Sequence, residues 1–281
     1  MTLSLRAKYE DECERQYLKM SDTTEILVLR TYATLKTHNG FTILMVPGWG
    51  SIVPGWDEFL LEAKKDFNVI YFETREKGSS KIFKTSQRGS MHRLSDDLAE
   101  VITQLGLDQS KLILFGSCIG ANIIAHGLVY GKYDPFMSYL IGPQPKWPIP
   151  KISKWVLPIA PKWFLTPIKP FLRYWLIKTQ CDTPETAAKY SRVLNEANSR
   201  KWHHVGLPIA FETYQDLFAR IRKKVAIVAE QGDKTHILED TFKIAQIIPN
   251  AELIVMKSNK AAHSVEMVDC IRKRMPAIKF S

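Results

Sequence analysis

The sequence has few cysteines and no long hydrophobic run. Its cysteines are widely and irregularly spaced in 281 residues, at Cys13, Cys118, Cys181 and Cys270. This spacing suits neither a disulfide framework nor a zinc site. No stretch reaches the ~18 uninterrupted apolar residues typical of a membrane-spanning helix, and the charged start of the chain lacks the apolar segment of a signal peptide. We therefore expect a cytoplasmic protein.

Motifs for nucleotides, phosphate groups and metal ions are also missing. The chain contains no glycine-rich dinucleotide fingerprint and no phosphate-binding loop. We therefore expect no bound cofactor and no metal ion. The net charge of +10 would suit an anionic partner, but no recognised nucleic-acid-binding module accompanies it, so we expect no nucleic acid partner.

Short apolar runs alternate with helical patterns from residue 42 onward. The runs are 42–46, 67–72, 111–115, 137–141, 225–228 and 253–256. Apolar residues recur at helical spacing in 91–107, 121–130, 238–248 and 264–275. This alternation predicts an α/β protein with a mostly parallel sheet flanked by helices. An antiparallel pair predicted within 17–35 would bring the sheet to about eight strands.

One segment interrupts the alternation. Residues 143–222 hold ten of the 15 prolines and five of the seven tryptophans, but a single glycine. This composition predicts a helical cap, 143–222, inserted into a core made of residues 1–142 and 223–281. Within the core, the first 15 residues are too charged for a helix or strand to be predicted there.

The strand at 111–115 is followed by a motif that suits a nucleophile. It reads Gly116-Ser117-Cys118-Ile119-Gly120 and leads directly into an apolar helix. In the pattern G-x-nucleophile-x-G the nucleophile sits on a strained turn, and the glycines allow backbone to approach where a Cβ would clash. The N-terminus of the following helix would favour a thiolate. The alternative is that Cys118 is a small buried residue in a tight turn.

An acid and a histidine follow in the chain order expected for such a nucleophile. Asp233 comes just after the strand at 225–228, and His263 lies in the loop after the last strand. Because parallel strands end at one edge of the sheet, all three residues would meet there. His263 would take the proton of Cys118, and Asp233 would orient the imidazole.

Acyl transfer also needs two backbone N–H groups that bind the carbonyl oxygen as it becomes negative. Ile119, directly after the nucleophile, would supply one. The other is predicted at Trp49, in the sequence Pro47-Gly48-Trp49-Gly50 that follows the strand at 42–46. The alternative is an ordinary glycine-rich turn.

Together these motifs resemble the α/β-hydrolase superfamily, from about residue 25 to the end. The residues that carry the resemblance also include Trp56, Glu73-Thr-Arg75-Glu-Lys-Gly78-Ser-Ser80 and the helix that starts near Leu94. Cysteine in the elbow, where serine is usual, is similar to dienelactone hydrolases and polyhydroxyalkanoate synthases. The resemblance implies an α/β-hydrolase fold and covalent acyl chemistry. In many relatives a histidine precedes Gly48, whereas this chain has Pro47.

The predicted cap has charge of one sign. No acidic residue occurs from Pro135 through Cys181, and seven basic residues alternate with aromatic ones. Such a segment could lie on an anionic membrane surface. It could also cover an acyl-chain pocket and attract a phosphate-bearing thioester such as acyl-CoA. In a third interpretation the aromatic residues pack the cap onto the core and the lysines face water.

The resulting hypothesis is an enzyme that hydrolyses ester or thioester bonds of a hydrophobic acyl substrate, acyl-CoA or a lipid among the candidates, through an acyl-cysteine intermediate. An acyltransferase would use the same intermediate, with an alcohol or amine in place of water. A non-catalytic protein could keep the fold as a ligand pocket or as a membrane-surface protein. The residues named so far do not separate these three classes.

Overall fold

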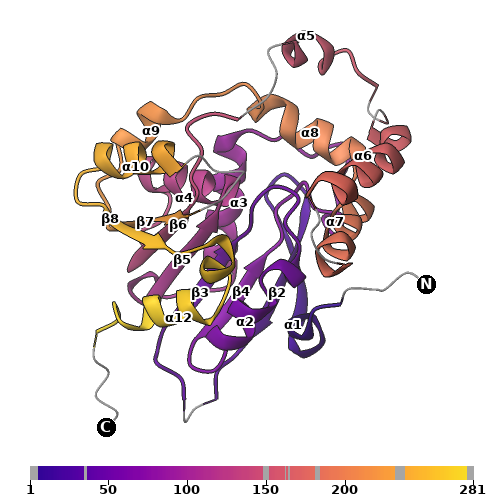
Figure 1. The fold of residues 1–281 in the computed structure, drawn as a ribbon. Coiled ribbons are helices and arrows are strands. Elements are labelled where there is room, and N and C mark those ends of the chain that lie inside the picture. The colour runs from indigo at the N-terminus through magenta and orange to yellow at the C-terminus, as the bar shows by residue number, and fades with distance from the viewer. Residues whose placement is uncertain are drawn as a thin grey trace.

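The computed structural model describes residues 6–34, 37–147, 152–161, 163, 165–180, 184–231 and 238–276. Its centre is an eight-stranded sheet of order β1-β2-β4-β3-β5-β6-β7-β8 (Figure 1). The first two strands are antiparallel, and the six from β3 to β8 run parallel. The predicted mostly parallel sheet with a preceding antiparallel pair is therefore confirmed.

The strand boundaries lie within one or two residues of those predicted for the parallel part of the sheet. The strands are β1 Glu14–Lys19, β2 Glu25–Thr31, β3 Thr42–Val46, β4 Asn68–Phe72, β5 Leu112–Ser117, β6 Met137–Ile141, β7 Val225–Glu230 and β8 Glu252–Met256. Central strands such as β5 and β7 are buried at every position. This is why they appear in the sequence as unbroken apolar runs.

Helices cover both faces of the sheet. The α-helices are α1 Lys8–Glu12, α2 Asp57–Ala63, α3 Met91–Gln104, α4 Ile119–Val129, α5 Ser153–Val156, α6 Leu165–Gln180, α7 Pro184–Glu196, α8 Ser199–Ile209, α9 Gln215–Ala219, α10 Leu238–Ile247, α11 Asn259–Ala262 and α12 Val265–Arg272. Two short 3-10 turns, Val53–Gly55 and Gln109–Lys111, complete the described elements. The four crossover helices predicted from the sequence correspond to α3, α4, α10 and α12.

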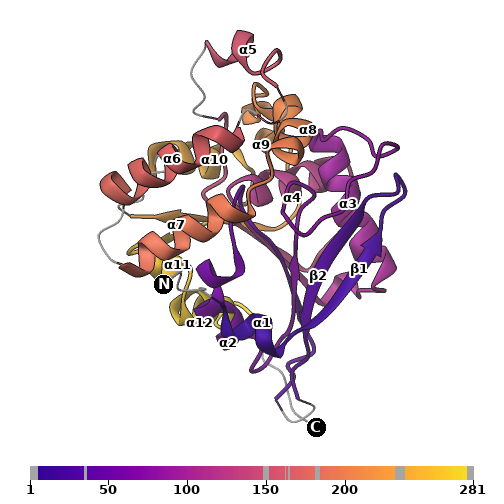
Figure 2. The ribbon, with the colours of Figure 1, turned by 90° about the vertical axis from the view of Figure 1, so that its right-hand side faces the viewer.

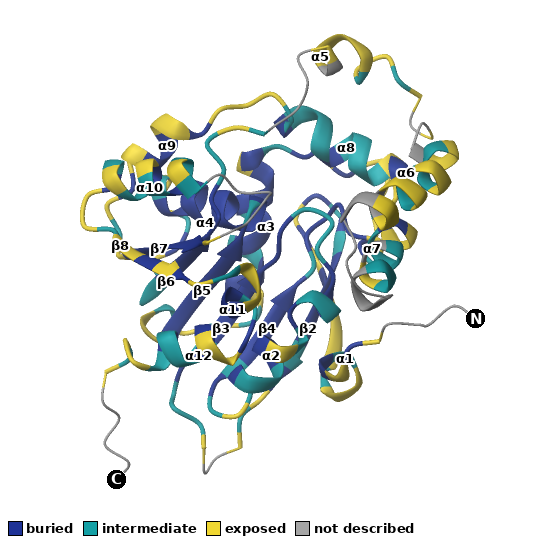
Figure 3. Ribbon diagram, in the orientation of Figure 1, coloured by how far each residue is buried: buried dark blue, intermediate teal, exposed yellow. Residues whose placement is uncertain are grey.

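The two faces of the sheet make separate hydrophobic cores. One face packs against α3, α4 and α10, and the other against α1, α2 and α12. The dark blue strands in Figure 3 show the sheet buried between these layers. Helix α1, in a region too charged to be assigned from sequence, contributes the fully buried Tyr9, whose hydroxyl donates to the Val69 carbonyl.

Helices α5 to α9 lie between β6 and β7, in the segment predicted as a cap. Figure 2 shows α5 at the end of the molecule farthest from α1 and α2. Helix α6 packs against α7. The division of the chain into a core of 1–142 and 223–281 and a cap of 143–222 remains a prediction. None of the helices in the described ranges is long and apolar enough to cross a bilayer.

A buried guanidinium joins three parts of the fold. Arg75, in the loop after β4, is fully buried and makes a two-pronged ion pair with Asp97 of α3, both distances being 2.6 Å. Its third nitrogen donates to Asp22, in the turn between β1 and β2, at 2.9 Å. Arg75 therefore fixes the loop after β4 against the hairpin and against α3.

The ion pair with Arg75 depends on pH. Burial acts to raise the pKa of Asp22, but the hydrogen bond and positive charge of Arg75 outweigh it and lower that pKa to about 2. Because the folded-state pKa lies below the unfolded value, the ionised carboxyl stabilises the fold fully above a pH of about 4. This contribution is lost as the pH falls toward 2.

We predict that Arg75→Met lowers the free energy of unfolding by about 3–5 kcal/mol at neutral pH, because buried Asp22 loses its cation and buried Asp97 keeps only Arg93. Urea denaturation measures it. The matched control is Arg88→Met in the same loop, where the side chain is exposed, and it should change stability by less than about 0.5 kcal/mol. Equal effects of both substitutions would contradict a special role for Arg75.

Candidate functional site

Cys118 lies on a strained turn between β5 and α4. Its backbone has φ 53° and ψ −118°, and α4 begins at the next residue. Residues other than glycine rarely adopt a positive φ, and where they do the strain is often tied to function. The Cys118 N–H donates to the carbonyl of Ile141 at the end of β6, at 2.9 Å. The half-buried thiol therefore lies at the edge where the parallel strands end.

The two glycines of the motif make this turn possible. A Cβ on Gly120 would lie 1.9 Å from the carbonyl oxygen of Val46, the last residue of β3. A Cβ on Gly116 would lie 2.6 Å from the Ile124 side chain and 2.8 Å from the Ala121 nitrogen. Any side chain would force these segments apart, so both glycines are required by close packing.

The loop after β3 lies directly beside Cys118. A Cβ on Gly48 would be 3.1 Å from the Cys118 Cβ. The Gly48 carbonyl accepts hydrogen bonds from Lys77 Nζ at 2.8 Å and from the Ser51 N–H at 3.1 Å. Because a trans peptide holds its C=O and N–H on opposite sides, the Trp49 N–H points away from Lys77. Within the described residues neither the Trp49 nor the Ile119 N–H donates a hydrogen bond.

Lys77 is a site residue that the sequence analysis missed. Its side chain is buried, and its ammonium group also donates to the Ser51 carbonyl at 2.8 Å. A lysine that is only 6% exposed and has two carbonyl partners in one loop fixes the conformation of that loop. The motif Glu73-Thr-Arg75-Glu-Lys-Gly78, noted in the sequence, contains Lys77. The sequence does not show which backbone carbonyls the Lys77 ammonium group contacts.

The segment between β6 and β7 also contacts this loop. The Trp49 indole packs edge-on against Trp202 of α8, with ring centroids 5.5 Å apart. Gly206 on the same helix leaves room for Trp49, because a Cβ there would come within 2.7 Å of the indole. Lys201, also on α8, donates to the carbonyls of Lys77, Gly78 and Ser80. Helix α8 therefore holds both the Trp49 loop and the Lys77 loop.

His263 follows α11 and packs on Trp56. The ring centroids are 3.8 Å apart, and the planes are tilted by 32°. The Nδ1 atom lies 2.7 Å from the Asn259 carbonyl oxygen. Since a carbonyl only accepts, Nδ1 carries the proton in this arrangement, and in the neutral ring Nε2 keeps its lone pair.

Described contacts link His263 to the turn of Cys118 through the loop after β3. Trp56 donates from Nε1 to the Ser51 hydroxyl at 2.9 Å, and it packs edge-on against Phe115 of β5. Ser51 in turn donates to the Gly48 carbonyl, beside Cys118. The structure thus places Cys118, the Trp49 loop and His263 in one contact network at the carboxyl edge of the sheet.

A buried carboxylate lies near the histidine. Glu230, the last residue of β7, is buried, and its Oε1 lies 3.6 Å from His263 Nδ1. Its Oε2 accepts from the Asn259 side chain at 3.1 Å. The predicted acid, Asp233, lies outside the described residues, so its position relative to His263 remains a prediction. In the sequence, Glu230 could have been noticed as a carboxylate at the end of an otherwise apolar strand.

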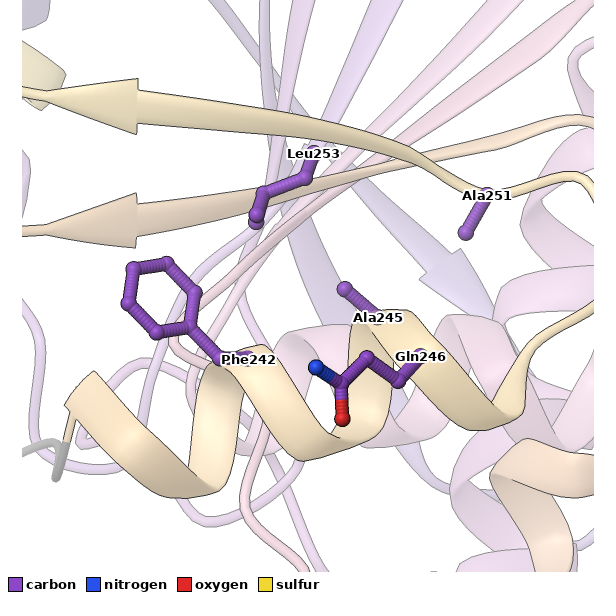
Figure 4. Close-up of a pocket in the computed structure, with 5 residues that line it drawn as sticks. All are labelled: Phe242, Ala245, Gln246, Ala251 and Leu253. Atoms are coloured by element: carbon purple, nitrogen blue, oxygen red, sulfur yellow. The ribbon is translucent and has the colours of Figure 1, made fainter.

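A surface hollow elsewhere has a different character. It lies between α10 and β8, where Phe242, Ala245 and Gln246 face Ala251 and Leu253 (Figure 4). These five lining residues include no ionisable or nucleophilic side chain, so this hollow carries no group for acyl transfer. The elements that line this hollow also differ from the elements that hold Cys118 and His263.

Comparison with known proteins rests on structure. No family model matches the sequence, and no curated protein is detectably similar to it. A hydrolase from Pseudomonas aeruginosa PA01 superposes with a TM-score of 0.71 at 14% identity, over 92% of this chain and 96% of that one. A thermophilic esterase from Thermogutta terrifontis superposes with a TM-score of 0.72 at 18% identity, over 93% of this chain and 97% of that one.

An esterase from Exiguobacterium antarcticum also gives a TM-score of 0.72, at 16% identity over 93% of this chain and 96% of that one. An α/β hydrolase from Sphaerobacter thermophilus gives 0.67 at 17% identity, over 92% and 99%. The sheet order and the helices on both faces agree with this likeness over nearly the whole chain. The chain therefore has the α/β-hydrolase fold.

Proposed function

We propose that this chain is a hydrolase of carboxylic ester or thioester bonds in which Cys118 is the nucleophile. The observation that carries the proposal is the positive φ of Cys118 at the strand-to-helix turn, with the loop of Gly48 and Trp49 beside it. In this fold such a turn presents the nucleophile above the sheet and next to two backbone N–H groups. The N–H groups of Trp49 and Ile119 are the proposed oxyanion donors.

In the first half-reaction, His263 takes the thiol proton, and the sulfur attacks the carbonyl carbon of the substrate. The carbonyl oxygen becomes negative and is stabilised by the two N–H groups. When the C–O or C–S bond of the substrate breaks, the leaving group takes the proton from His263 and an acyl-cysteine remains. Water then attacks the thioester, giving its proton to His263, and the thiol is regenerated as the acid leaves.

The acid that orients His263 is proposed to be Asp233. Glu230 supports the same ring from β7, at 3.6 Å from Nδ1. A carboxylate near Nδ1 stabilises the imidazolium that forms during each proton transfer. Asp233 and Glu230 are close in sequence. Of these two carboxylates, the one that contacts His263 Nδ1 during the reaction contributes more to the rate.

The proposed nucleophile is tested by incubating the chain with short and long p-nitrophenyl esters and with acyl-CoA thioesters, and recording product release and intact mass. We expect a covalent acyl adduct and turnover with the native chain, and neither with Cys118→Ala. Cys13→Ala and Cys270→Ala are the controls, because these half-buried thiols lie outside the turn and their loss should leave the rate unchanged.

Two other outcomes have clear meanings. An adduct that forms without turnover in water, but is released by an added alcohol or amine, would replace hydrolysis by acyl transfer. No adduct and no product from any substrate would overturn the enzymatic proposal and leave a protein that binds ligands without catalysis.

The orienting acid is identified by comparing Asp233→Asn with Glu230→Gln. We expect Asp233→Asn to lower kcat by about 10⁴-fold, as loss of the orienting acid does in such triads. Glu230→Gln should lower it by roughly tenfold or less, since its removal weakens support for the imidazolium only in part. Steady-state kinetics measures both. The reverse order would assign the orienting role to Glu230.

Lys77 is predicted to position the oxyanion loop. Lys77→Met removes the ammonium group from the Gly48 and Ser51 carbonyls, so the Trp49 N–H loses its fixed direction. We expect kcat to fall by up to about 100-fold with KM little changed, because a shift of ~1 Å at a catalytic group is sufficient for this loss. The control is Lys201→Met, which frees the neighbouring carbonyls but not that of Gly48. Equal losses of kcat in both variants would indicate a purely structural role.

A further inference from the structure

Large hydrophobic side chains are exposed in one part of the molecule. Among the described residues, nine of the 17 exposed large hydrophobic side chains lie within 152–177. They include Trp155, Trp163, Phe171 and Tyr174, which are between 61% and 75% exposed. Figure 3 shows α5 and much of α6 in the colour of exposed residues. These exposures argue against the interpretation that the aromatic residues pack this segment onto the core.

Helix α6 turns aromatic side chains toward solvent and two of its three cations toward the protein. Phe171 and Tyr174 are exposed, whereas Lys169 and Arg173 are half-buried. Lys169 donates to the Ala197 carbonyl, and Arg173 donates to the Asn195 side chain. A helix on the surface of a soluble protein ordinarily has the opposite orientation, with its apolar side on the core. A surface of this kind marks an interaction site.

The charged residues within this segment are all basic. Lys146, Lys154 and Lys178 are exposed, and the sequence from Pro135 through Cys181 contains no acidic residue. Lys178 lies over the Tyr174 ring, with Nζ 5.8 Å from the ring centroid. The partner that fits this surface therefore has a negatively charged outer layer with an apolar interior beneath it. Aromatic rings and lysines with long stems favour such an interface between lipid and water.

We propose that the exposed side chains of 152–178, here called the α5–α6 surface, dock onto an anionic phospholipid bilayer. The aromatic and aliphatic side chains would enter the headgroup region, and the lysines would contact lipid phosphates. The contact proposed is peripheral. A symmetric dimer through this surface is disfavoured, because it would place the same lysines opposite one another. Docking is independent of the chemistry at Cys118.

The test uses the full chain with Cys118→Ala, so that lipid turnover does not interfere. The protein is sedimented with vesicles of phosphatidylcholine alone and of phosphatidylcholine mixed with phosphatidylglycerol. We expect binding to the mixed vesicles, weaker binding to phosphatidylcholine alone, and weakening at about 1 M salt, where the screening length is only ~3 Å.

Two pairs of variants separate the apolar and ionic contributions. Trp155→Ser and Phe171→Ser should each weaken binding by roughly tenfold or more, as expected for a buried aromatic side chain. Lys154→Gln and Lys178→Gln should each weaken binding to the mixed vesicles by about fivefold. The matched controls are Phe83→Ser and Lys111→Gln, which are exposed on other parts of the surface and should have no effect.

Three results would overturn the proposal. The first is the absence of binding to both kinds of vesicle. The second is binding that the control substitutions weaken as much as those on the α5–α6 surface. The third is a dimer in sedimentation velocity that Trp155→Ser or Phe171→Ser converts to a monomer, which would make this surface an interface between two copies. Circular dichroism of each variant confirms that the fold is retained.

Discussion

The ion pair between Arg75 and the two carboxylates of Asp22 and Asp97 is the constraint on which the rest of this structure depends. A fully buried guanidinium is tolerated only where carboxylates and carbonyls compensate its charge. Here its partners come from the first hairpin and from α3. These contacts fix the position of the loop after β4. Lys77 lies two residues after Arg75 in this loop, and its ammonium group donates to the Gly48 carbonyl. The buried charge and the geometry beside Cys118 are thus parts of one arrangement.

The strained turn at Cys118 joins the fold to the site. A backbone conformation of this type costs about 1–3 kcal/mol and persists only where the surroundings impose it. Gly120 lies against the end of β3 so closely that a Cβ would clash with the Val46 carbonyl. The same contact brings the Gly48 loop next to Cys118. Close packing of the start of α4 on the end of β3 therefore places Cys118 beside the proposed oxyanion donors.

The helices between β6 and β7 have two different roles. Helix α8 is attached to the core, since Trp202 packs on Trp49 and Lys201 binds the loop that carries Lys77. Helices α5 and α6 instead expose aromatic side chains. The segment between β6 and β7 therefore carries the proposed lipid-binding surface and also contacts the proposed oxyanion loop. That arrangement suits an enzyme whose substrate has a hydrophobic acyl part.

The sequence by itself determined the strands, the crossover helices and the motif around Cys118, because each depends on local patterns. Unbroken apolar runs identify buried parallel strands, and two glycines flanking Cys118 identify a turn without room for side chains. The order of Cys118, Asp233 and His263 along the chain also suggested a triad.

The tertiary structure alone decided which distant groups meet. Lys77 and Glu230 were visible in the sequence as ordinary charged residues, and only the packing showed that one holds the Gly48 carbonyl and the other lies near His263. The orientation of the aromatic residues of α6 was likewise decided only by the tertiary structure. Helical spacing shows that they share a side of the helix, but which side faces the protein depends on contacts with α7 and with the residues after it.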